Sequence, residues 1–110
     1  MAKDPVKRKT FIDSIPPFLK KYGFDGVDLD WENPGDRLGA DPAVDKENFS
    51  KLVDELKQAL EPDGLLLTAA LAPGIPKIEV AYDIPYISER FDIMNIMTYD
   101  YHGWFPPDHP

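Results

Sequence analysis

The chain contains the stretch Asp25-Gly26-Val27-Asp28-Leu29-Asp30-Trp31-Glu32, in which acidic and apolar residues alternate. Successive side chains of a β-strand point to opposite faces. In a strand over residues 24–31, Asp28 and Asp30 therefore share one face, and Glu32 continues the same row. The apolar residues between them, Trp31 included, point to the other face, where we expect them to pack against helices.

Three acids in one row predict a chemical site rather than a solvated surface. A water-facing edge strand can carry acids on one face, but it rarely places three like charges at successive positions. Crowded carboxylates cannot all ionise easily, so at least one is expected to keep its proton near neutral pH. A carboxylic acid that holds a proton is what general-acid cleavage of a glycosidic bond requires. Asp25 has the opposite parity, and we interpret it as a supporting residue at the start of the strand.

The residues before this strand predict a helix that starts behind Asp4-Pro5 and ends at Gly23. Pro16-Pro17 lies inside it, and an interior proline removes a backbone donor, so we expect a kink or a restart there. One helical face collects the apolar residues Phe11, Ile12, Ile15, Phe18 and Leu19.

The residues after the acidic strand continue the alternation of helices and strands. Residues 33–44 are rich in Gly, Asp and Pro and predict a loop, and a helix begins near Asp45 and ends before Pro62-Asp63-Gly64. The apolar run 65–72 is typical of a strand covered on both faces. Residues 78–87 predict a weak helix interrupted by Pro85, and residues 91–99 a third strand. Strands separated by helices predict an α/β fold with a parallel sheet.

Composition limits the classes of partner. The chain has 110 residues, a formal net charge of −8, 43% hydrophobic residues and no cysteine. An acidic balance argues against nucleic acid and anionic membrane surfaces as partners. No apolar run reaches the roughly 20 residues that span a bilayer, and the first residues lack the apolar core of a signal peptide. The absence of cysteine excludes disulfides and thiolate metal sites within these residues.

The motif Asp25-x-x-Asp28-x-Asp30-x-Glu32, with Tyr22-Gly23-Phe24 before it, resembles the signature of glycoside hydrolase family 18, which includes chitinases. Met97-Thr98-Tyr99-Asp100 resembles the sixth-strand signature of that family. The resemblance implies a (β/α)8 TIM barrel, an architecture of about 250 residues. We therefore expect residues 1–110 to be a fragment of the catalytic barrel, a partial TIM barrel of about three βα units that correspond to strands four to six.

The resemblance also implies roles for the residues that match. Glu32 protonates the leaving oxygen, and the substrate's own N-acetyl oxygen attacks the anomeric carbon in a substrate-assisted, retaining mechanism. Asp30 orients and stabilises the acetamido group, and Asp28 shares charge and hydrogen bonding with Asp30. Tyr99 holds the N-acetyl group from the third strand.

The implied substrate is chitin or an N-acetylglucosamine oligosaccharide, with Met97 and Asp100 lining the same subsite. Trp104 is a candidate for stacking on a sugar ring, although a packed loop aromatic fits it equally. The pattern of the third strand alone favours Met97 and Tyr99 as core residues, and it is the acidic strand beside them that favours the substrate site. The chain departs from the family at Asn33, where a Tyr commonly follows the Trp-Glu pair.

Three classes of function are compatible with the acids. The first is hydrolysis of β-1,4-linked N-acetylglucosamine polymers by the full-length parent, which is expected to be extracellular, with the fragment alone inactive. The second is a non-hydrolytic, chitin-binding lectin, which in this family typically lacks the acid corresponding to Glu32. The third is a metal enzyme that uses Asp28 and Asp30 as oxygen ligands. No phosphate-binding glycine loop accompanies the acids in this sequence, which weakens the hypothesis of a metal enzyme. His102 and His109 lack partners at metal-ligand spacing, and we expect neither a metal nor a cofactor.

Overall fold

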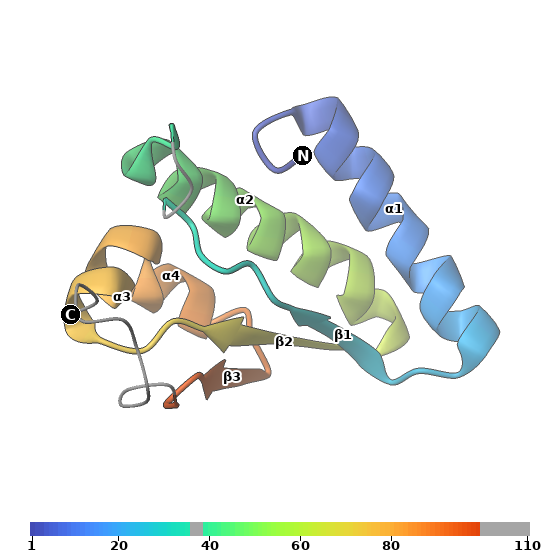
Figure 1. The fold of residues 1–110 in the computed structure, drawn as a ribbon. Helices are drawn as coiled ribbons and strands as arrows, with labels where there is room; N and C mark the ends of the chain where they lie inside the picture. The colour runs from blue at the N-terminus through green and yellow to red at the C-terminus, as the bar shows by residue number, and fades with distance from the viewer. Residues whose placement is uncertain (36–38, 100–110) are drawn as a thin grey trace.

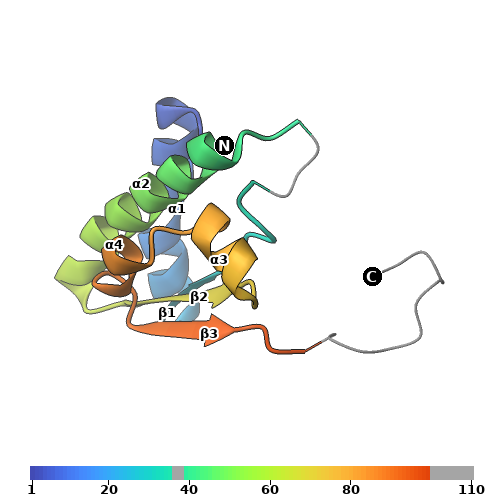
Figure 2. The same ribbon diagram turned by 90° about the vertical axis from the view of Figure 1, so that its left-hand side faces the viewer.

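The computed structural model describes residues 1–35 and 39–99. Three parallel strands, β1 (Gly26–Leu29), β2 (Leu66–Leu71) and β3 (Ile93–Ile96), form one sheet in the order β1-β2-β3. The helices are α1 (Pro5–Tyr22), α2 (Pro42–Leu60), α3 (Ile75–Ala81) and α4 (Ile84–Ser88), with a 3-10 turn, η1, over Glu61–Asp63. The two long helices lie side by side over one face of the sheet, and no described helix covers the other (Figures 1 and 2). The predicted α/β class with parallel strands is therefore confirmed.

The two faces of β2 differ sharply in burial. Leu67, Ala69 and Leu71 point to the helices and are at most 1% exposed, whereas Leu66 on the other face is 44% exposed. The expectation that this apolar run is covered on both faces is wrong for the part of the chain that the structure describes, because only the helical layer packs on it. Each strand is also shorter than predicted, since the backbone pairing ends before the apolar pattern does.

Helix α1 begins where its sequence predicted. The carboxylate of Asp4 accepts hydrogen bonds from the backbone N–H of Val6 (2.9 Å) and of Lys7 (3.3 Å). Pro5 occupies the first turn, where no intrahelical donor is needed. Gly23 ends the helix with a left-handed φ of 70°.

The prediction of a restart at the two prolines is wrong, because α1 runs through Pro16 and Pro17 as a single helix. Each proline removes one backbone hydrogen bond, but the apolar face on either side stays packed. Ile12, Ile15 and Leu19 are all buried. Phe18, expected on that face, is 54% exposed. Its ring instead contacts aromatic rings at the surface, those of Tyr22 and Phe24.

Helix α2 starts at Pro42, three residues before the predicted start near Asp45. Asp41 accepts hydrogen bonds from the backbone N–H of Ala43 and Val44, so the Asp-Pro pair caps α2 as it caps α1. Val53, Leu56 and Leu60 of this helix are fully buried and form the centre of the core.

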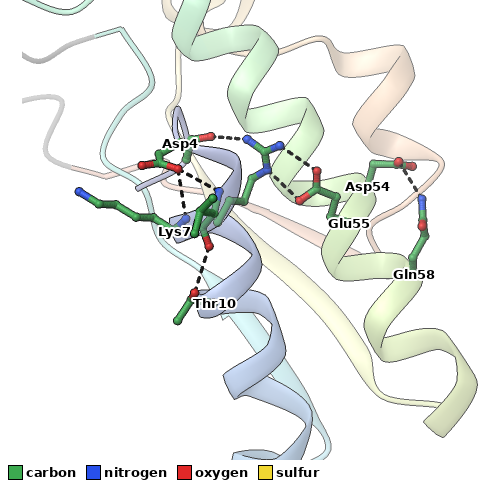
Figure 3. A network of polar contacts seen from close by, with 9 residues as sticks. Asp4, Lys7, Thr10, Asp54, Glu55 and Gln58 are labelled. Carbon is green, nitrogen blue, oxygen red and sulfur yellow. Dashed lines mark hydrogen bonds and ion pairs between the residues drawn. The ribbon is translucent and has the colours of Figure 1, made fainter.

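A buried arginine of α1 joins the two long helices through Glu55 of α2, which Figure 3 labels within the network of polar contacts. Arg8, 6% exposed, donates to both carboxylate oxygens of Glu55 at 2.7 and 2.9 Å and to the carbonyl of Ala2 at 2.6 Å. A buried guanidinium needs such partners because an unpaired buried charge is costly. The contact fixes α1 against α2 and holds the start of the chain beside them.

The segment after β2 forms two short helices instead of one. The break falls at Tyr82 and Asp83, not at Pro85, which lies in the first turn of α4. Asp83 caps α4 by accepting from the N–H of Tyr86 (3.3 Å). The hydroxyl of Tyr82, a residue only 2% exposed, accepts from the N–H of Ala72 (3.1 Å) and so fixes the chain just beyond β2. No described helix has both the length and the apolar character needed to cross a bilayer.

Candidate active site

The acidic row lies on the uncovered face of the sheet, along β1 and just beyond its carboxyl end. Asp28, Asp30 and Glu32 are all exposed, whereas Leu29 between them is only 8% exposed. Trp31 is half-buried and its ring lies 5.9 Å from that of Phe49 on α2. The alternation of burial agrees with the strand parity that the sequence predicted, including the packing of Trp31 against a helix.

The close approach of β1 to β2 explains the glycine at the start of β1. A Cβ atom added to Gly26 would lie 2.2 Å from the backbone oxygen of Leu66. The preceding residue, Asp25, accepts a hydrogen bond from the N–H of Leu66 through its backbone carbonyl (2.9 Å). Asp25 thus anchors the start of the strand through its backbone, while its side chain is exposed.

Glu32 has a raised pKa, in the direction that the crowding of acids predicts. The main cause is a side-chain hydrogen bond with Asp30, followed by the charge of Asp30 and then by desolvation. Only a protonated carboxyl group can donate to a neighbouring carboxylate. Glu32 beside Asp30 therefore keeps its proton to a higher pH than an isolated glutamate would.

Sequence reasoning missed Thr68, whose hydroxyl donates to Oδ1 of Asp28 at 2.7 Å. The two residues face each other in the register of β1 and β2. Thr68 is the one polar residue in the apolar run 65–72. A lone hydroxyl in such a run is a signal that could have identified it, but its partner depends on the register between strands.

The residues predicted from the third strand lie farther away. Asn95 faces Ala70 of β2 in the register, and β3 ends at Ile96. Two strand spacings separate β3 from β1, a distance of about 10 Å. Met97 is half-buried and Tyr99 is 62% exposed.

The expectation that one strand runs to residue 99 is wrong. The N–H of Thr98 donates to the carbonyl of Ile96 (2.9 Å) and that of Tyr99 to the carbonyl of Met97 (3.0 Å). These short-range bonds turn the backbone, so strand parity does not fix the directions of the Met97 and Tyr99 side chains. Asp100, His102, Trp104 and His109 lie outside the described residues.

The loop after the acidic row is held against α2 and α3. The N–H of Gly35 donates to Asp45 Oδ2 at 2.8 Å, and Pro34 is buried. The peptide between Glu32 and Asn33 is cis. Asn33 and Gly35 line a hollow of about 200 Å³ together with Lys77 of α3. Across residues 1–35 and 39–99, no group of three His, Asp or Glu side chains is arranged to hold a metal ion.

Comparisons with known proteins agree on one family. The sequence model of the family described as glycosyl hydrolases family 18 matches residues 1–109. "Probable chitinase 2" of Drosophila melanogaster is 47% identical over 96 residues, which are 87% of this chain and 19% of that protein. The chain thus spans about a fifth of the length of that curated relative.

Solved structures show the same likeness. Catalytic domain 2 of the Ostrinia furnacalis Group II chitinase is 39% identical and has a TM-score of 0.86, covering 93% of this chain and 27% of that one. A mutant of that domain has been solved in complex with (NAG)5. The Ostrinia furnacalis Group IV chitinase in complex with allosamidin is 38% identical with a TM-score of 0.87, covering 94% of this chain and 28% of that one. The three parallel strands and their helices match part of the TIM barrel of these chitinases, which confirms the expected fold.

Proposed function

The chain belongs to glycosyl hydrolase family 18, and on that premise we propose that it supplies the acid catalyst of a chitinase, with Glu32 as the proton donor. The proposed reaction is hydrolysis of β-1,4-linked N-acetylglucosamine polymers by the whole protein. The observation that carries the proposal is the acidic row, in which a hydrogen bond to Asp30 raises the pKa of Glu32. The substrate class is supported by the (NAG)5 and allosamidin complexes of the similar chitinases.

In the proposed first step, Glu32 gives its proton to the oxygen of the scissile bond, and the bond from that oxygen to the anomeric carbon breaks. The carbonyl oxygen of the substrate's N-acetyl group attacks the same carbon and forms an oxazolinium-type intermediate. Asp30 orients the acetamido group and stabilises its developing positive charge. Asp28, next in the row, shares charge and hydrogen bonding with Asp30.

In the second step, the ionised Glu32 takes a proton from water, and the oxygen of that water attacks the anomeric carbon. The bond from the acetyl oxygen to the anomeric carbon breaks, the acetamido group returns to its original form, and the configuration at that carbon is retained. Glu32 ends the cycle protonated, as it began. A raised pKa suits this double role, because the group must hold a proton first and accept one later.

Further contacts with the sugar are proposed for residues beyond β3. The hydroxyl of Tyr99 is a donor suited to the N-acetyl carbonyl. Met97 and Asp100 would line the same subsite, and Trp104 would stack on a sugar ring. Asp25 would have a supporting role: its backbone carbonyl pairs with Leu66 just before β1 and so helps to position the strand that carries the acidic row. Asn33, which replaces the family's usual Tyr, would change one substrate contact without affecting the acid.

A chimera tests the proposal directly. Residues 1–110 would replace the matching segment of catalytic domain 2 of the Ostrinia furnacalis Group II chitinase, and hydrolysis of a chitin oligosaccharide would be measured. We expect the chimera to be active. Because general-acid catalysis contributes about 10²- to 10⁴-fold, Glu32→Gln should lower kcat by at least a hundredfold with little change in fold by circular dichroism.

Glu61→Gln is the matched control, because Glu61 is an exposed residue of η1 at the opposite end of the strands. It should leave kcat unchanged. A folded chimera that binds the oligosaccharide but does not turn it over would favour the lectin alternative. Full activity in Glu32→Gln would remove Glu32 from the role of acid.

Two further parts of the proposal concern the chain itself and its location. The 110-residue chain alone is expected to hydrolyse little or no oligosaccharide, since its described strands form only an open sheet. Extracellular location of the whole protein is proposed from the family, and immunodetection in culture medium against cell lysate would test it.

A further inference from the structure

Thr68 carries the only hydroxyl on the three described strands of the sheet. It stands opposite Asp28 in the parallel register, on the same uncovered face. Its Oγ1 donates to Asp28 Oδ1 at 2.7 Å, a length typical of a good hydroxyl–carboxylate bond. Leu67 and Ala69, its neighbours along β2, point to the other face and are fully buried, so the strand holds Thr68 rigidly in place.

This contact acts on one end of the acidic row. Oδ1 of Asp28 receives the hydroxyl proton and is thereby fixed as an acceptor. A proton shared within the row is then better placed at the other end, where Asp30 favours the protonated form of Glu32. Without the hydroxyl, Asp28 Oδ1 would lose the donor that the structure gives it, and nothing would fix this end of the row as the acceptor.

No other charge on the sheet can take over this effect. Between residues 66–71 and 93–96, β2 and β3 carry no ionisable side chain. On β1 and its flanks, the ionisable neighbours are Asp25 and the row itself. The neighbouring helices contribute two charged residues near Glu32. Asp45 of α2 accepts a hydrogen bond from the N–H of Gly35, and Lys77 of α3 lines the same hollow as Asn33.

We propose that Thr68 is a positioning residue for the acidic row: its hydroxyl holds Asp28 as an acceptor and so keeps the catalytic proton on Glu32. The proposal deepens the chitinase function, since it rests on Glu32 being the acid. It assigns Thr68 no contact with the sugar. Its effect passes through Asp28 and Asp30.

The test is a carboxyl-carbon NMR titration of Glu32 in the 110-residue chain, without ligand. Thr68→Val keeps the branched shape and removes the hydroxyl, and Thr68→Ser keeps the hydroxyl. We expect the titration midpoint of Glu32 to fall toward the ordinary value of a glutamate in Thr68→Val and to stay at the wild-type value in Thr68→Ser. Thr10→Val is the matched control, because Thr10 donates to the carbonyl of Val6 on α1, away from the row (3.0 Å).

An unchanged midpoint in Thr68→Val would overturn the proposal, and so would an equal fall in Thr10→Val or in Thr68→Ser. If the amide NMR spectrum shows that Thr68→Val does not fold, Thr68→Ala also removes the hydroxyl, and the midpoint of Glu32 is expected to fall in that variant instead. A purely structural role for Thr68 would change unfolding without moving the midpoint. Because the titration uses no chitin, its result is independent of whether the chimera hydrolyses an oligosaccharide.

Discussion

The pairing of Glu32 with Asp30, which suits the chemistry proposed for Glu32, also makes the stability of the fold depend on pH. The hydrogen bond and the charge of Asp30 raise the pKa of Glu32. The folded state therefore binds this proton more tightly than the unfolded chain does. Its contribution to stability is fully present below the unfolded pKa and is lost as the pH rises through the folded pKa. Above the folded pKa of Glu32, its charge and that of Asp30 repel each other in the fold.

Glu32→Gln is therefore expected to raise the melting temperature of the 110-residue chain near neutral pH. The amide removes one charge and can still donate to Asp30. Below the ordinary titration range of a glutamate, wild type and variant should melt together, because Glu32 is then protonated in both states. Thermal unfolding followed by circular dichroism across the pH range measures the melting temperatures of both proteins near neutral pH and at low pH.

Glu61→Gln provides the comparison, since Glu61 is exposed and lies away from the row. Glu61→Gln should not reproduce the pH-dependent rise in melting temperature that we expect for Glu32→Gln. A Glu32→Gln chain that melts below wild type at neutral pH would show that the pair does not repel in the fold.

At single residues, sequence reasoning succeeded where the pattern is local. Strand parity placed Asp28 on the face opposite buried Leu29, and it placed Trp31 against a helix. The contact between Thr68 and Asp28 joins residues 40 apart in the chain, so only the register could reveal it. For Tyr99, parity failed because the backbone turns after Ile96.

Among the elements, α2 organises the core, and its apolar face predicted that role. Leu56 is fully buried at its centre. Leu56→Ala is expected to lower the free energy of unfolding by about 2–5 kcal/mol, the cost of lost burial and a cavity. Urea unfolding of the chain measures the change.

The matched control lies on the exposed side of the same helix. Gln58 contacts Asp54 within α2 and is exposed, so Gln58→Ala should change the free energy of unfolding by no more than about 0.5 kcal/mol. Equal losses in the two variants would mean that helix propensity, rather than the core, limits stability.

The ends and breaks of elements were harder to predict than their existence. The Asp-Pro pairs start α1 at Pro5 and α2 at Pro42, but the polar residues around the second pair suggested a loop. The two prolines within α1 suggested a break that the packed face of Ile12 and Leu19 prevents. In both cases a local preference competes with capping or packing that the chain acquires only when folded.

For the whole molecule, the decisive feature is a sheet covered on one face only. Leu66 and Ile93 are 44% and 55% exposed on the uncovered face, and within residues 1–35 and 39–99 the outer edges of β1 and β3 pair with no strand. Exposed edges and apolar sheet faces promote pairing between chains. The family resemblance implied this openness, since three strands cannot close a barrel.

We therefore expect the 110-residue chain to associate in solution as its concentration rises, despite its net charge of −8. Ile93→Lys places a charge on the uncovered face of the edge strand β3 and should reduce the association, because a buried lysine at a strand-to-strand contact is costly. Val6→Lys is the control: Val6 is 73% exposed but lies on α1, over the opposite face. Sedimentation velocity over a range of concentrations compares the three proteins. A wild-type chain that stays monomeric throughout, or an equal effect of both lysines, would show that the open sheet does not drive association.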